Sequence, residues 1–159
     1  MDYIDIVYDM EIMGNFFCLN TRHLDNSTHV FRLNDREEFL KMYNNTGIRL
    51  WGMNNAEYDD LMLKAWLMGY TVPELQSLNN KIIHLSKIEA YREIPDLNDI
   101  KDLSSYKFIT GDLYKLIGKG NGLKMLGIII GHKTLEELPF APGSMLSAEE
   151  KEIMIDYCH

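Results

Sequence analysis

Two carboxylates lie one residue apart near the start of the chain. Asp9 and Glu11 come at the end of an apolar stretch that begins at Ile4. In a strand, alternate side chains share a face, so both acids would point the same way. Like charges held that close repel one another unless a cation lies between them. A divalent metal between strand carboxylates is a common basis for phosphodiester cleavage, but two solvated acids on an edge strand explain the pair equally well.

A third acid follows a second predicted strand. Asp59 opens an expected helix, whose positive N-terminal end would face the same site. By itself, Asp59 or Asp60 is typical of a solvated acid in a first helical turn. Asn54 lies five residues before Asp59 and Tyr58 immediately before it, and this combination with the first acidic pair is a more specific signal.

These residues resemble the motifs of a known nuclease family. Asp9-x-Glu11 resembles the first motif of the DEDD 3′–5′ exonucleases. Asn54-x-x-x-Tyr58-Asp59 resembles the second motif, in the form found in proofreading domains of family B DNA polymerases. The fold of that family is RNase H-like, so the resemblance implies an α/β domain with a mixed sheet flanked by helices.

The resemblance continues to the C-terminal end of the chain. The tyrosine subclass has a third motif, Tyr-x-x-x-Asp, and Tyr157 matches its first position. Segments 123–127 and 135–143 are also similar to the exonuclease regions of phage-type DNA polymerases. The similarity therefore extends from Tyr3 to His159, and its specificity comes from three motifs in order.

The family pattern is incomplete at that end. The last Asp of the third motif would fall two positions beyond His159. Asp156 cannot replace it, because on a helix it lies about 100° from Tyr157. His159 is also not five residues before that Asp, as the histidine subclass requires. We expect one exonuclease-like domain over 1–159 that stops before its last catalytic Asp, whether through shortening of the chain, an interrupted gene or a naturally incomplete product.

The resemblance implies two-metal chemistry with Mg²⁺ or Mn²⁺, the ions that all-oxygen ligand sets favour. In such sites two ions about 3.5–4 Å apart bridge the carboxylates and the scissile phosphate. By resemblance, Asp9 would contact both ions, Glu11 the nucleophile-side ion, and Asp59 the other ion through water. Tyr157 would orient the attacking water, whereas a tyrosine judged alone at this position is typical of helix packing.

The resemblance also implies a substrate and a partner. The main chain at Met10 and Ile12, together with Asn54 and Tyr58, would hold the last nucleotides of a single-stranded or frayed DNA 3′ end, which aromatic stacking suits. The chain would then be the proofreading exonuclease of a phage-type DNA polymerase, with a polymerase domain as its partner. Two alternatives stay open: a catalytically silent module of the same fold that binds DNA or a protein, and an RNA-directed exonuclease.

Composition narrows the class of protein. The 159 residues, 46% hydrophobic and 25% charged, predict one soluble globular domain. The apolar stretch 123–130 is too short to span a bilayer. Asp2 and Asp5 lie where a signal peptide would carry positive charge, so we expect no export signal. With only Cys18 and Cys158, we expect reduced thiols and a cytoplasmic location, in a bacterial host if a phage encodes the chain. A net charge of −8 argues against an extended electrostatic binding surface for duplex DNA. It does not argue against a site that binds only the end of a strand.

Periodicity and turn residues predict the elements that position these side chains. We expect an antiparallel meander of three strands followed by alternating helices and parallel strands. The predicted strands are 3–12, 16–21, 29–33, 48–53 and 106–110. The first predicted helix is capped by Asn34 or Asp35, runs through 37–43 and ends near 45–47. The other predicted helices are 59–68, one or two over 71–91, 112–117, 123–130 and a last one after Ser147.

A few further residues have two explanations. Asp112 follows a predicted strand and either caps the next helix or approaches the metal site, and the cap is the simpler role. The glycine-rich run 118–122 lacks a phosphate-binding fingerprint and is better explained as a helix break. Trp51 and Trp66 are expected in the core. The histidines have no paired ligand spacing, and we assign them no chemistry.

Overall fold

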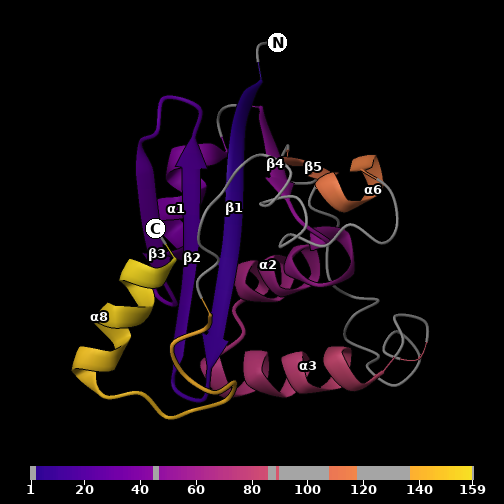
Figure 1. The fold of residues 1–159 in the computed structure, drawn as a ribbon. Helices are drawn as coiled ribbons and strands as arrows, with labels where there is room; N and C mark the ends of the chain where they lie inside the picture. The colour runs from indigo at the N-terminus through magenta and orange to yellow at the C-terminus, as the bar shows by residue number, and fades with distance from the viewer. Residues whose placement is uncertain (1–2, 45–46, 86–88, 90–107, 118–136, 159) are drawn as a thin grey trace.

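A five-stranded mixed sheet in the order β3-β2-β1-β4-β5 forms the centre of the protein (Figure 1). The computed structural model describes residues 3–44, 47–85, 89, 108–117 and 137–158. The strands are β1 (Ile4–Met13), β2 (Phe16–His23), β3 (Thr28–Arg32), β4 (Ile48–Gly52) and β5 (Phe108–Asp112). The helices are α1 (Arg36–Tyr43), α2 (Asp59–Met68), α3 (Val72–His84), α6 (Leu113–Ile117) and α8 (Ala148–Tyr157), with a 3₁₀ turn η1 (Asn55–Glu57).

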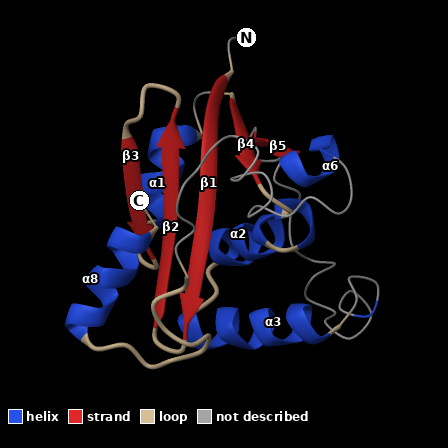
Figure 2. Ribbon diagram, viewed as in Figure 1, coloured by secondary structure: helices blue, strands red, loops and turns tan. Residues whose placement is uncertain are grey.

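The sheet combines the two pairing modes that the sequence predicts. β1, β2 and β3 pair antiparallel in chain order, as a meander. β4 and β5 pair parallel, with β4 placed beside β1. Helices lie against the sheet (Figure 2). The predicted α/β class, with a mixed sheet flanked by helices, is therefore confirmed.

β1 has two chemically different faces because its sequence alternates. Tyr8, Met10 and Ile12 are buried in the main hydrophobic cluster on one face. Asp9 and Glu11 therefore lie on the opposite face. There Asp9 is paired with Asn20 of β2, and Glu11 with Cys18. The strand period thus places both acids side by side, as expected.

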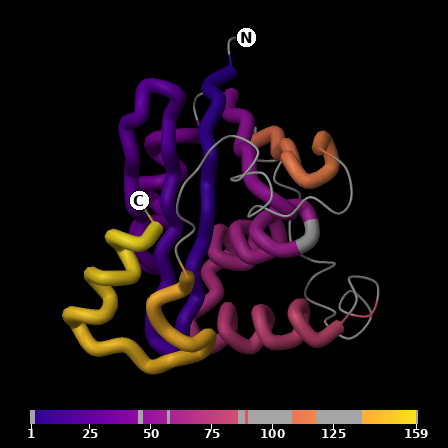
Figure 3. The backbone as a smooth tube through the Cα atoms, viewed as in Figure 1, coloured from indigo at the N-terminus to yellow at the C-terminus, as the bar shows by residue number. Residues whose placement is uncertain are grey.

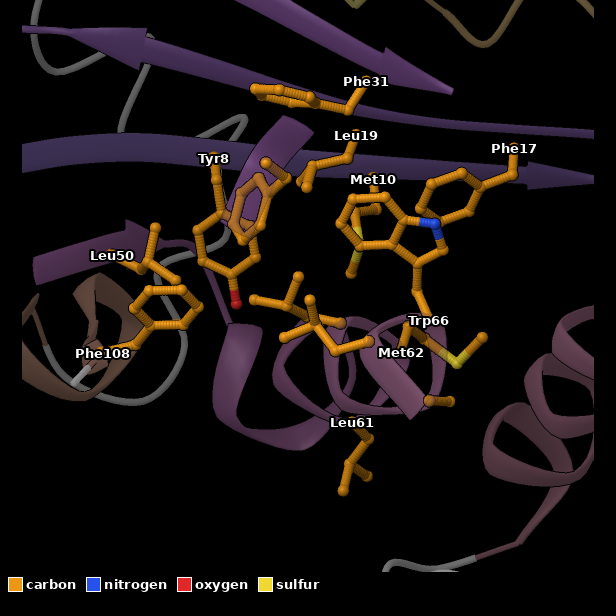
Figure 4. Close-up of a cluster of buried hydrophobic side chains, with 14 of the residues drawn as sticks. Tyr8, Met10, Phe17, Leu19, Phe31, Leu50, Leu61, Met62, Trp66 and Phe108 are labelled. Carbon is orange, nitrogen blue, oxygen red and sulfur yellow. The ribbon is translucent and has the colours of Figure 1, made fainter. Parts of the chain in front are cut away.

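The main core lies between the sheet and the helices α1, α2 and α3 (Figure 4). Trp66 of α2 is fully buried there, stacks on Phe17 at 5.2 Å between ring centroids, and donates its indole N–H to the carbonyl of Leu33 at 2.8 Å. Phe39 of α1 packs edge-on against Trp66 at 5.4 Å. The prediction that Trp66 is a core residue is confirmed.

Trp51 does not belong to that core, so its predicted role is wrong. Its side chain is half-buried, and its indole N–H donates to the carboxylate of Asp5 at 2.8 Å. Arg49 forms a bidentate pair with the same carboxylate, with both N···O distances 2.6 Å. A Cβ on Gly111 would come within 2.4 Å of the Trp51 ring. The indole therefore packs across Gly111, its partner on β5, where no side chain obstructs it.

α8 covers the opposite face of the sheet. Met154 of α8 and Leu146 pack on Met13, Phe16 and Cys18 in a second, smaller cluster. The helix begins at a capping box, in which Ser147 accepts from the Glu150 N–H and Glu150 accepts from the Ser147 N–H. Its C-terminal end approaches the middle of β2 (Figure 3).

The observed elements match most predicted ones within one or two residues. Two differences have local causes. Asp35 occupies the N-cap position of α1, but its carboxylate accepts from the Arg32 N–H at 2.7 Å and makes no cap bond to the helix. β5 continues to Asp112, two residues beyond the predicted end, because its pairing with β4 reaches Gly52. Predicted helix 123–130 and glycine run 118–122 lie outside the described residues. Within the described residues, every helix falls short of the length and apolarity needed to cross a membrane.

Candidate functional site

A cavity of about 380 Å³ lies at the end of β1, and three carboxylates line it. Asp9 and Glu11 come from β1, and Asp59 comes from the first turn of α2. The remaining lining residues are Met10, Ile12, Met13, Met53, Asn54, Tyr58, Asn79, Ile83, Leu138 and Pro142. The structure therefore brings the three predicted acids to one cavity. Four predicted substrate-binding residues, Met10, Ile12, Asn54 and Tyr58, line it as well.

The two acids of α2 have separate surroundings although they are adjacent in sequence. Asp59 faces the cavity. Asp60 is buried in the other direction, where it accepts from the hydroxyl of Tyr8 at 2.5 Å and from the side-chain amide of Asn55 at 3.1 Å. Burial, and secondly the Asp60 charge, raise the pKa of Tyr8 well above its usual range. Asp60 is thus a structural acceptor, and the expectation of a solvated acid is wrong for it.

Negative charge on the carboxyl groups is unfavourable in this cavity. Burial raises the pKa of Glu11 to about 7, with a further contribution from the charge of Asp9. Burial likewise raises the pKa of Asp59 to about 8, and Asp9 adds to that shift. The pKa of Asp9 is also raised by burial, against a hydrogen bond from the Met10 main chain. The three carboxyl groups therefore favour either a proton or a cation in this cavity.

The donor set fits a hard divalent cation, since the acidic side chains offer only carboxylate oxygens. However, in the described ranges no three His, Cys, Asp or Glu side chains form a ready-made metal-binding group. Asp9, Glu11 and Asp59 share a cavity and repel one another without converging on a single point. The predicted pair of Mg²⁺ or Mn²⁺ ions stays a prediction.

Asn54 is fixed at the cavity edge through its main chain. It has the left-handed backbone angle φ of 63°, and its N–H donates to the Asp112 carboxylate at 2.8 Å. The same oxygen of Asp112 accepts from the Tyr114 N–H at 3.0 Å, in the first turn of α6. The predicted helix cap at Asp112 is confirmed. Asp112 also holds the Asn54 loop, while the Asn54 side chain is exposed at the cavity.

α3 supplies a wall of the cavity that the sequence motifs did not predict. The hydroxyl of Tyr58 donates to the side-chain oxygen of Asn79, which is buried on α3. Ile83, one turn further on, lines the same cavity with 60% of its surface exposed. One signal was present in the sequence: Asn79 interrupts the apolar face that Leu75 and Leu78 define.

Tyr157 is placed differently from the three acids. It lies at the C-terminal end of α8, half-buried, and packs on the second hydrophobic cluster. It is not among the residues that line the carboxylate cavity. The next residue, Cys158, lines a neighbouring cavity of about 170 Å³ together with Asp9, Asn20 and Arg22. The end of α8 therefore lies on the carboxylate face of the sheet, and the role of Tyr157 in orienting water stays a prediction.

Comparison with known proteins assigns no family to this site. No protein-family model, curated protein or solved structure matches the chain.

Proposed function

We propose that the carboxylate cavity is the active site of a divalent-metal-dependent 3′–5′ exonuclease of the DEDD type, on an RNase H-like fold. One observation carries this proposal: a strand and a helix far apart in the sequence bring Asp9, Glu11 and Asp59 to one cavity, which is open to solvent. The raised pKa values of the partly buried Glu11 and Asp59 support it, because a bound cation would relieve the repulsion.

In this proposal the three carboxylates bind Mg²⁺ or Mn²⁺. When bound, two such ions supply Lewis-acid activation of water and neutralisation of charge at a phosphodiester. Asp9 and Glu11 hold their carboxylates at a fixed spacing because both belong to the part of β1 that is paired with β2, opposite Asn20 and Cys18. Asp59 adds a carboxylate from a helix end. Tyr157 would orient the attacking water.

The rest of the cavity suits the end of a single strand. Met53, Ile83 and Leu138 give it apolar walls that a base or sugar can contact, and the exposed Asn54 side chain offers polar groups at the rim. This combination tolerates different bases, as a proofreading nuclease requires. We propose single-stranded or frayed DNA 3′ ends as the substrate and a polymerase domain as the partner.

The proposal is tested by degradation of a 5′-labelled single-stranded DNA in Mn²⁺. The chain is compared with a version lengthened by two residues that ends in Asp, each with and without Asp9→Asn. Glu38→Gln, an exposed acid on α1, is the matched control. Stepwise shortening from the 3′ end, lost in Asp9→Asn and kept in Glu38→Gln, would support the exonuclease. Absence of shortening in every version, at any Mn²⁺ concentration, would contradict it.

A second candidate is a catalytically silent module that binds a DNA end. The same experiment separates the two functions if DNA retention is measured in parallel. Metal-dependent retention of the labelled strand without shortening, by the lengthened version also, would favour the silent module.

A further inference from the structure

The two cysteines of the chain lie beside one another in the folded protein. Cys18 is in the middle of β2, and Cys158 directly follows α8, 140 residues further on. Their Sγ atoms are 3.4 Å apart, and both thiols are free. Cys18 is fully buried, whereas Cys158 is partly exposed. The sequence predicts two reduced thiols and does not predict that they are close in space.

Several contacts independent of sulfur hold the two residues in this arrangement. Cys18 is fixed by strand pairing on both sides, opposite Glu11 and Arg32. The Cys158 N–H donates to the Met154 carbonyl at 3.1 Å, which continues the helical bonding of α8. The Cys158 carbonyl accepts from the side-chain amide of Asn20, two residues after Cys18 on β2. The sulfur pair is thus a consequence of how the end of α8 docks on β2.

We propose that Cys18 and Cys158 form a redox modification site, at which a small-molecule disulfide converts the two thiols into an intrachain disulfide. A disulfide requires the sulfur atoms to close from 3.4 Å to about 2.05 Å. Rotation about the Cα–Cβ bond of the partly exposed Cys158 can supply this movement, while Cys18 stays in the sheet. The proposal does not depend on the proposed nuclease activity.

The chemistry is two successive thiol–disulfide exchanges. The hydrogen bond with Cys18, and secondly burial, raise the pKa of the Cys158 thiol, so the exchange needs alkaline buffer to form the thiolate. The thiolate of Cys158, the more accessible residue, then attacks one sulfur of the small disulfide, and one small thiolate leaves. The thiolate of Cys18 then attacks the Cys158 sulfur of this mixed disulfide, and the second small thiolate leaves. The two cysteines lose two protons and two electrons in total, and the small disulfide is reduced to two thiols.

The product would tie the end of α8 to the middle of the sheet. Without it, α8 is held by the second hydrophobic cluster, by the Asn20 bond and by an exposed ion pair between Arg32 and Glu152 at 3.1 Å. The disulfide would close a loop of 140 residues, and such long loops give large losses of unfolded-state entropy. We expect the oxidised chain to unfold about 10 °C higher than the reduced chain.

The test incubates the reduced chain, at low micromolar concentration, with oxidised glutathione and measures intact mass, peptide linkage and Tm. The proposal predicts a monomer lighter by two hydrogen atoms and a raised Tm. It also predicts a linked pair of tryptic peptides, residues 1–22 with residues 152–159. Cys158→Ser is expected to give neither the link nor the Tm shift.

Two controls keep the outcome clear. Cys18→Ala and Cys18→Ser are compared, because a polar group at this buried position can itself destabilise the fold. Disulfide formation is also measured in urea, where any cysteine pair can react. Stable glutathione adducts on Cys158, disulfide-linked dimers, or a link that forms only in urea would each overturn the proposal.

Discussion

Asp59 and Asp60 are consecutive residues in the first turn of α2, yet one faces the carboxylate cavity and the other accepts a hydrogen bond from Tyr8 in the core. Successive helical residues point about 100° apart, so a boundary between core and cavity can pass between them. The two residues have the same side chain but different roles. Asp60 stabilises the fold, and Asp59 belongs to the proposed site.

Substitution of Asp60 is expected to cost stability. Asp60→Ala leaves the buried Tyr8 hydroxyl and the Asn55 amide without their acceptor, so we expect a loss of about 2 kcal/mol in the free energy of unfolding. Urea unfolding followed by circular dichroism measures it. Asp59→Asn, at the adjacent position, is expected to cause no such loss. Equal destabilisation by both substitutions would contradict the separation of roles.

The carboxylate cavity is expected to make stability fall with rising pH. The folded-state pKa values of Glu11 and Asp59 are raised to about 7 and about 8, from ordinary values of 4.5 and 3.8. Between about pH 4 and pH 8 the folded chain therefore binds more protons than the unfolded chain. The stabilisation is fully present below pH 4 and is lost as the pH rises to 8.

This pH dependence has a simple check in metal-free buffer. Asp59→Asn removes one of the groups concerned, so we expect it to raise the free energy of unfolding at pH 8 by about 1–2 kcal/mol and to flatten the slope. Glu38→Gln, on the surface of α1, is the control and should leave the slope unchanged. A slope of the opposite sign, or one insensitive to Asp59→Asn, would be inconsistent with mutual repulsion in the cavity.

Gly111 is expected to tolerate no side chain while Trp51 is present. A Cβ at this position would lie 2.4 Å from the indole, so Gly111→Ala must displace the ring and weaken its bond to Asp5. We expect a loss of about 1–3 kcal/mol in urea unfolding. The double variant Trp51→Ala/Gly111→Ala removes the clash. It should therefore be more stable than the sum of the single effects predicts, and strict additivity would argue against the contact.

The hydrogen bond between Tyr58 and Asn79 is expected to stabilise the position of α3 beside the cavity. Tyr58→Phe leaves the buried oxygen of Asn79 without a donor, at a cost of about 1 kcal/mol. Tyr58→Phe/Asn79→Leu removes both polar groups and should recover most of that stability. If the double variant is less stable than Tyr58→Phe, Asn79 has a role beyond this bond.

The sequence predicted those features that depend on a regular period. The alternation along β1 predicted that Asp9 and Glu11 share a face, and the apolar positions of α2 predicted that Trp66 is buried. Asp112 was recognised as a cap from its place between a strand and a helix. Each of these inferences depends only on local geometry, which can be read from the order of the residues in the sequence.

The remaining features depend on contacts between distant elements. No local pattern reveals that Trp51 lies over Gly111, that Asn79 bonds to Tyr58, or that α8 ends beside β2. The proximity of Cys18 and Cys158 is of this kind, because it arises only when the last helix docks on a strand from the start of the chain. Such long-range relationships need the tertiary structure.

The most direct test of the account is binding of Mn²⁺ to the carboxylate cavity, measured by the loss of the free-ion paramagnetic resonance signal. We predict that the unmodified chain and Glu38→Gln bind Mn²⁺ alike, and that Asp9→Asn and Asp59→Asn each weaken binding by about tenfold or more. Identical binding by all four proteins, or none by any of them at millimolar Mn²⁺, would contradict the assignment of this cavity as a metal site.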